Sequence, residues 1–179
     1  SGLFYRKIAK FLIDNDINLK KINKIKQILI KIDNFSLRNN NNLRNEHIGK
    51  ASSIIAKMNF VRNHVNKQQI LHTEQKNNKK GFVIDGRDIG SVVFKKAFLK
   101  LYVEVDENIR AKRRYKQLID NGEKSIYLKI LKDIKLRDKT DKLRKNSPLV
   151  VPRGAKIIDN SHTFKTTIAQ IRKIIEGIN

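Results

Sequence analysis

The fold is indicated most directly by residues 81–90, which read Gly-Phe-Val-Ile-Asp-Gly-Arg-Asp-Ile-Gly. The apolar run at positions 82–84 is short and rich in strand-forming residues, which predicts a buried β-strand. A loop with two glycines and the charged residues Asp85, Arg87 and Asp88 follows directly. Ligands bind at the carboxyl ends of strands in open parallel sheets, so this loop is a candidate binding site. An ordinary turn with a surface ion pair is the alternative on spacing alone.

Further strands and helices alternate around this stretch. Residues 99–105 and 155–158 are short apolar runs that predict two more strands. Helical periodicity is present over residues 1–14, 22–32, 47–75, 106–121, 125–145 and 163–178. We therefore expect an α/β fold of three layers, with a parallel sheet covered by helices on both faces.

The composition narrows the class of protein. The 179 residues suit one domain, and 40 Lys+Arg against 17 Asp+Glu give a net charge of +23. This charge favours a phosphate-bearing partner, although AT-rich codon usage would also produce the excess of Lys, Asn and Ile. The absence of Cys and four scattered His argue against a metal site. Without a long apolar run or signal sequence, we expect a cytoplasmic protein with no membrane partner.

One predicted helix contains charges on the stripe that its apolar residues occupy. Arg137, Asp141 and Arg144 are spaced i, i+4, i+7 and continue the stripe of Ile130 and Ile134. Charges that face inward are costly unless they pair closely or line a polar cleft. The alternative is a solvated row of ion pairs.

A second predicted helix has three arginines on one face: Arg110, Arg113 and Arg114. Their guanidinium groups repel one another and favour a shared anion such as a polyphosphate. A merely basic surface is the alternative. Ser53 and Arg62, nine residues apart in another predicted helix, give no signal on their own.

Together these segments resemble the bacterial cytidylate kinases, members of the nucleoside monophosphate kinase group of P-loop proteins. The matching residues are Ser1-Gly2-Leu3-Phe4-Tyr5-Arg6, Ser52-Ser53, Val61-Arg62, 85–94, 110–114, 137–144 and Pro148-Leu149-Val150. The resemblance covers nearly all of the chain. It implies transfer of the terminal phosphoryl group of ATP, with Mg²⁺, to CMP or dCMP.

The resemblance implies contacts to the base and the sugar of the acceptor nucleotide. Ser53, Arg62 and Asp88 are expected to recognise cytosine. Arg137 and Asp141 are expected to contact the sugar.

The resemblance also implies phosphate contacts. Arg6, Arg87 and Arg144 are expected to hold the acceptor phosphate. The arginines expected to close over the transferring group as a mobile lid are Arg110, Arg113 and Arg114.

The domain organisation follows from the same resemblance. We expect one domain over residues 1–179, a reduced acceptor-side insertion at 18–46, and lid and acceptor-contacting helices over 110–145. We expect a monomer whose partners are nucleotides and not a specific nucleic acid. A basic nucleic-acid-binding module, or a CMP-binding remnant without kinase activity, stays open as an alternative.

One part of the family's pattern does not occur in these residues. The phosphate-binding GxxxxGK[ST] loop and the strand before it are absent from the 179 residues. We therefore expect an N-terminally incomplete sequence whose ATP-binding residues are unknown. In the family that strand lies centrally, between those expected at 82–85 and 99–105. Without it we expect this chain to be poorly stable and inactive as a kinase.

Overall fold

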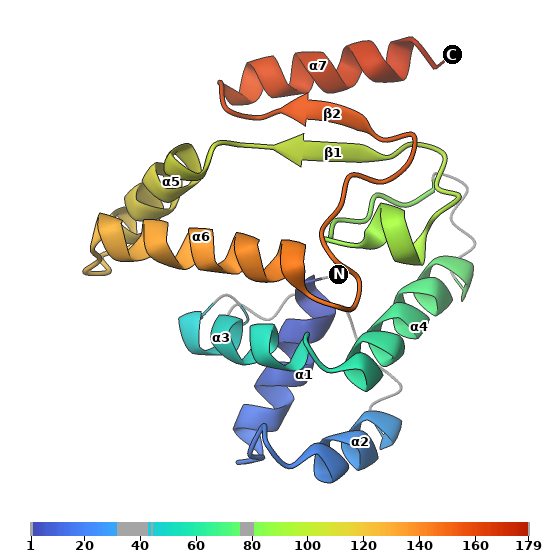
Figure 1. Ribbon diagram of the computed structural model, residues 1–179, viewed down its shortest axis with the longest axis vertical. Coiled ribbons are helices and arrows are strands. Elements are labelled where there is room, and N and C mark those ends of the chain that lie inside the picture. The colour runs from blue at the N-terminus through green and yellow to red at the C-terminus, as the bar shows by residue number, and fades with distance from the viewer. Residues whose placement is uncertain (1, 32–42, 44, 76–80, 179) are drawn as a thin grey trace. The chain divides into compact units, whose positions relative to one another are not determined.

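The computed structural model describes residues 2–31, 43, 45–75 and 81–178. The chain divides into two compact units, Ser1–Ile89 and Gly90–Asn179. Helices and a small parallel sheet make up the described elements (Figure 1). This agrees with an α/β fold.

The first unit is formed by helices. These are α1 (Gly2–Asp14), α2 (Ile22–Lys31), α3 (Glu46–Ile55) and α4 (Asn59–Gln75). Helix α1 packs against α3, and α2 packs against α4. The predicted helices over 1–14 and 22–32 are confirmed for the residues that the structure describes.

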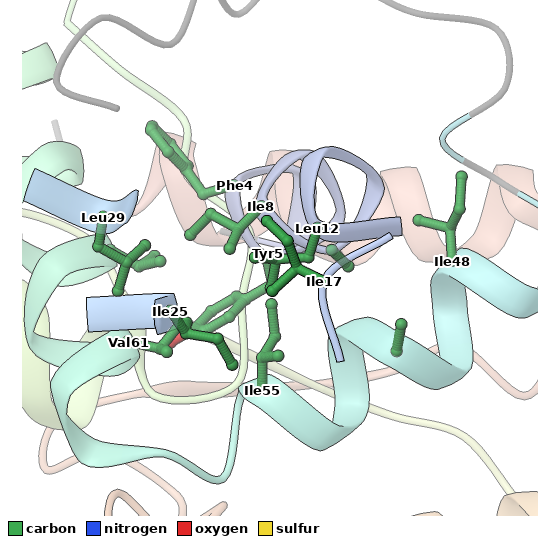
Figure 2. Packing of buried hydrophobic residues seen from close by; sticks show 13 residues of the cluster. Phe4, Tyr5, Ile8, Leu12, Ile17, Ile25, Leu29, Ile48, Ile55 and Val61 are labelled. Atoms are coloured by element: carbon green, nitrogen blue, oxygen red, sulfur yellow. The ribbon is translucent and has the colours of Figure 1, made fainter. Parts of the chain in front are cut away.

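All four helices contribute to one apolar core, which Figure 2 shows from close by. Ile8 and Leu12 of α1, Ile25 of α2, Ile55 of α3 and Val61 of α4 are fully buried. Burial of such a side chain contributes about 1.5–3 kcal/mol, so this cluster is the main stabilising element of the unit.

The prediction of one helix over residues 47–75 is wrong. The chain turns at residues 56–58, between α3 and α4, and the guanidinium of Arg62 donates to the carbonyl of Ala56 at 3.0 Å. Because α3 packs on α1 and α4 packs on α2, the turn allows Ile55 and Val61 to enter the same core. No glycine or proline marks this turn, so local sequence does not reveal it.

The predicted buried strand at 82–84 is also wrong. Residues 81–86 have no regular secondary structure, Phe82 is 38% exposed and Val83 is fully exposed. A strand needs a hydrogen-bonding neighbour, and none of the described strands pairs with these residues.

The second unit contains the sheet. Strand β1 (Leu101–Glu104) pairs in parallel with β2 (Lys156–Asp159), and the register runs from Leu101 opposite Lys156 to Glu104 opposite Asp159. Helix α7 (Phe164–Glu176) packs beside β2, as Figure 1 shows. Both strands and their parallel direction confirm the prediction.

Within the second unit the sheet is only partly covered. Val103 is 52% exposed and Ile157 is 56% exposed, while Ile158 is fully buried. The helix that packs on β2 in this unit is α7, and a three-layer arrangement stays a prediction.

Two antiparallel helices connect the strands. These are α5 (Glu107–Asp120) and α6 (Tyr127–Leu143), and both were predicted. The side chain of Asp106 caps α5 by accepting from the backbone N–H of Asn108 at 2.8 Å. Gly122, with φ of +77°, follows α5. Ala111, Leu118 and Ile130 form a small core between α5 and α6.

Three further points concern the predicted insertion, a short helix after the loop at 85–88, and membrane-spanning helices. Residues 32–42 and 44 of the predicted insertion at 18–46 lie outside the described residues. A short π-helix, η2 (Ile89–Val93), follows the loop at 85–88. Among the described helices, none combines the length and the apolar character needed to span a bilayer.

Candidate functional site

A buried ion pair joins Arg62 and Asp88 in the first unit. The Nη2 of Arg62 donates to the carboxylate of Asp88, and each side chain is only 5% exposed. The Tyr5 ring lies 5.8 Å from the guanidinium carbon. A buried charge is tolerated only when it is paired and hydrogen-bonded, and this pair satisfies that condition.

Residues 82–88, which end at Asp88, lie alongside helix α4. The Phe82 ring centroid lies 6.1 Å from that of His72 near the end of α4, and Asp88 meets Arg62 near its beginning. Residues 82–88 therefore run along the helix without forming a strand. This placement brings Asp88 into the protein while Arg87 is only partly buried.

Ser53 and Arg6 have local partners. The Oγ of Ser53 donates to the carbonyl of Gly49 at 3.1 Å, and the neighbouring, buried Ser52 donates to the same carbonyl at 2.8 Å. The guanidinium of Arg6 donates to the carbonyl of Leu43 at 2.8 Å. A Cβ at Gly49 would lie 3.4 Å from the guanidinium nitrogens of Arg6, so the glycine lets α3 approach Arg6 closely.

In the second unit, Asp141 and Arg144 lie together at the end of α6. Arg144 Nη1 is 3.2 Å from Asp141 Oδ1, and the two side chains are 14% and 15% exposed. Arg144 Nε also donates to the carbonyl of Ser147, whose φ is +50°. The Nε of Arg137 is 3.9 Å from Asp141, but the Arg137 side chain is 59% exposed. The predicted inward stripe is thus found for Asp141 and Arg144.

The three arginines of α5 have different neighbours. Arg110 binds Asp138 of α6 with two hydrogen bonds. Arg113 donates to the carbonyl of His162 at 2.8 Å, which ties α5 to the loop after β2. Arg114 binds Gln117 within α5. A shared anion for these arginines stays a prediction.

The hydrogen bonds at the start of α5 shift the pKa values of Arg110 and Asp106. Hydrogen bonding to Asp138 raises the pKa of Arg110, which is therefore a permanent cation. The backbone N–H groups of Asn108 and Ile109 lower the pKa of Asp106, so this cap is ionised at neutral pH. In the described part of the chain, no three His, Cys, Asp or Glu residues form a group that could hold a metal ion.

Among the predicted site residues, the structure brings Arg62 together with Asp88 and Asp141 together with Arg144. Each pair lies within one unit. The sequence analysis assigned no role to Asp138, the partner of Arg110, although it lies beside Arg137 in the charged part of α6. The one sequence feature that could have drawn attention to Asp138 is its position directly after Arg137, the first residue of the charged stripe.

Comparisons with a family model and with individual proteins point to the same family. The family model described as cytidylate kinase matches residues 1–179. The cytidylate kinase of Rickettsia rickettsii (strain Sheila Smith) is 39% identical over 163 residues, which cover 90% of this chain and 71% of the relative. The cytidylate kinase of Rickettsia conorii is 38% identical over 161 residues, with the same coverage of each chain.

Proposed function

Since the chain belongs to the cytidylate kinase family, we propose that it transfers the terminal phosphoryl group of ATP to CMP or dCMP. An oxygen of the acceptor phosphate forms the new P–O bond, the bond to the ADP leaving group breaks, and CDP or dCDP results. Such reactions need positioning and charge stabilisation from the protein more than covalent chemistry. Nucleotides are thus the substrates of this family.

The observation that supports this proposal most strongly is the buried pair of Arg62 and Asp88. Cytosine presents an amino donor beside ring and carbonyl acceptors, so its edge requires an acceptor and a donor side by side. A carboxylate next to a guanidinium provides that arrangement. Ser53, whose hydroxyl is exposed on α3, completes the proposed set of base contacts.

Contacts to the sugar and to the acceptor phosphate are part of the same proposal. Asp141 accepts hydrogen bonds from sugar hydroxyls, and Arg137 lies beside it on α6. The proposed phosphate contacts are Arg6, Arg87 and Arg144. Neutralising the acceptor phosphate reduces its repulsion of the incoming phosphoryl group.

Lid and acceptor-contacting helices are assigned to residues 110–145. Arginine side chains there stabilise negative charge on the phosphoryl oxygens, and closure excludes water. The proposed residues are Arg110, Arg113 and Arg114. Mg²⁺ is proposed as a partner of the ATP phosphates, where it neutralises charge.

The test begins with acceptor binding, measured by isothermal titration calorimetry of the chain with CMP, dCMP, UMP and AMP. We expect CMP and dCMP to bind about tenfold more tightly than AMP, a difference of about 1.4 kcal/mol. Arg62→Met should remove this preference, whereas Lys132→Gln on the exposed surface of α6 should keep it. Equal binding of all four nucleotides would overturn the proposal.

The transfer step is tested on the gene product as its cell makes it, by following CDP formation from CMP and ATP. Turnover of CMP and dCMP, and little of AMP, is expected. Binding of DNA that weakens steeply with salt, without binding of CMP, would instead favour a nucleic-acid-binding protein.

A further inference from the structure

The side chain of Arg110 is held by three hydrogen bonds at the start of α5. Its Nη1 and Nη2 donate to the two carboxylate oxygens of Asp138 at 3.0 and 2.5 Å. Its Nε donates to the carbonyl of Val105 at 3.1 Å. Bidentate pairing of this kind fixes both the position and the plane of the guanidinium.

The surroundings make this pair more than an exposed surface contact. The side chains of Arg110 and Asp138 are 33% and 18% exposed, whereas the neighbouring pair Glu107 and Lys135 is 38% and 52% exposed. Partial burial limits solvent screening, so the first pair is expected to hold its geometry better. The two pairs nevertheless join the same two helices.

Helices α5 and α6 are connected along their length. Ala111 and Leu118 of α5 pack on Ile130 of α6, and the rings of Tyr115 and Tyr127 meet edge to face at 6.3 Å. The pair of Arg110 and Asp138 lies toward the other end of the same helix pair. Apolar packing and the ion pair together make the two helices one rigid element.

Asp138 thus connects two sets of residues with proposed functions. On α6 it lies directly after Arg137 and three residues before Asp141, which are assigned to the acceptor sugar. Through its hydrogen bonds it holds Arg110 of the proposed lid. A hollow of about 550 Å³ lies beside this pair, and its lining includes the acidic residues Asp106 and Glu107 as well as the lysines Lys135, Lys139 and Lys142.

We propose that Asp138 is a positioning residue for phosphoryl transfer: it fixes the orientation of Arg110 and makes the lid arginine move together with the acceptor contacts of α6. This inference rests on the proposed function. It assigns to Asp138 an effect on turnover, exerted through Arg110, and no direct contact with substrate.

The first experiment tests the geometry without requiring activity. In ¹H–¹⁵N spectra of the purified chain, the Nη–Hη signals of Arg110 should be shifted and slow to exchange, because both Nη atoms donate to the carboxylate of Asp138. Asp138→Asn should abolish that signature and Asp138→Glu should restore part of it. Glu107→Gln is the control: it removes the acidic group of the other ion pair between α5 and α6 and should leave the Arg110 signal unchanged. An unchanged Arg110 signal in Asp138→Asn would overturn the proposal.

The second experiment measures kcat and KM of the gene product for CMP. Asp138→Asn should lower kcat about tenfold or more, since displacement of a positioned group by about 1 Å can cost on the order of 100-fold. KM for CMP should change less than about threefold, and Glu107→Gln should change neither constant. Unchanged kcat in Asp138→Asn, or loss of thermal stability alone, would overturn the proposal.

The two experiments separate this inference from the proposed function. If the wild-type gene product phosphorylates no CMP, the proposed function fails, and with it the effect of Asp138 on turnover. The Arg110 signal then still decides whether Asp138 holds the guanidinium.

Discussion

Arg62 and Asp88 are separated by 26 positions in the sequence and form an ion pair in which each side chain is only 5% exposed. Arg62 is held at the start of α4, and Asp88 follows a segment without regular secondary structure. The pair therefore fixes an otherwise irregular loop to the helical core of the first unit. Removing either partner would leave a buried charge unpaired, which is strongly destabilising.

Asp88→Asn should lower the free energy of unfolding by about 3–5 kcal/mol, because it leaves the buried guanidinium of Arg62 without its countercharge. Arg62→Met combined with Asp88→Asn should cost less than the sum of the single changes. Urea unfolding followed by circular dichroism measures these differences. The matched control is Glu46→Gln, which breaks an exposed ion pair with Lys50 and should cost less than about 1 kcal/mol. Additive losses would show that the two residues do not interact.

Asp141→Ala should weaken binding of CMP about tenfold more than binding of dCMP. Only CMP has a 2′-hydroxyl, which would donate a hydrogen bond to the carboxylate of Asp141. Both nucleotides should lose some affinity, since Arg144 also loses its partner at 3.2 Å. Calorimetric titration with each nucleotide gives the ratio. Asp133→Asn, on an exposed position of α6, is the control. Equal losses for CMP and dCMP would remove Asp141 from the sugar contacts.

Much of the helical part of the fold could be predicted because its signals are local. Asp106 at the start of α5, Gly122 after it and the apolar period of α1 each mark an element where the structure has it. The turn at residues 56–58 could not be predicted, because it depends on which helices α3 and α4 pack against. Residues 82–84 have strand propensity, but propensity forms no strand where no neighbour pairs with it.

The candidate site was predictable to a similar degree. Helical spacing placed Asp141 and Arg144 on one partly buried stripe, and the structure confirms that they meet. Arg62 and Asp88 give no local signal for pairing, so the family resemblance brought them into one proposed site. The contact of Asp138 with Arg110 joins two helices and has no local signal.

Lys7→Met should stabilise the protein by on the order of 1 kcal/mol, because Lys7 is 9% exposed on α1 and its burial disfavours the charged form. Burial lowers the pKa of Lys7, so the folded state binds this proton less tightly than the unfolded state. The cost is therefore fully present below the folded-state pKa and disappears as the pH rises through the unfolded value of about 10.4. Urea unfolding at neutral pH should show the gain. A less stable Lys7→Met variant would contradict this view.

Asp106→Ala should lower Tm at neutral pH, because it removes the side-chain cap of α5. Hydrogen bonds from Asn108 and Ile109 lower the pKa of Asp106. The contribution of the cap is thus fully present above the unfolded pKa of about 3.9 and is lost as the pH falls through the folded value. The difference in Tm between wild type and variant should shrink below about pH 4. Asp120→Ala, at the opposite end of α5, should show no such pH-dependent loss. A constant difference would exclude the capping role.

Gly90→Ala should lower the free energy of unfolding by about 1–3 kcal/mol, because the added methyl group would lie 3.0 Å from Cγ of Pro152. The ring of Pro152 is rigid, with Cγ and Cβ at 3.0 and 3.3 Å from that methyl group, so this neighbour can yield little. Combining Gly90→Ala with Pro152→Ala removes the ring and should recover part of the loss, as measured by urea unfolding of all three variants. Gly2→Ala is the control, because no heavy atom lies within 4 Å of the position of its Cβ. If Gly90→Ala is as stable as wild type, close packing of Pro152 is not what requires a glycine at this position.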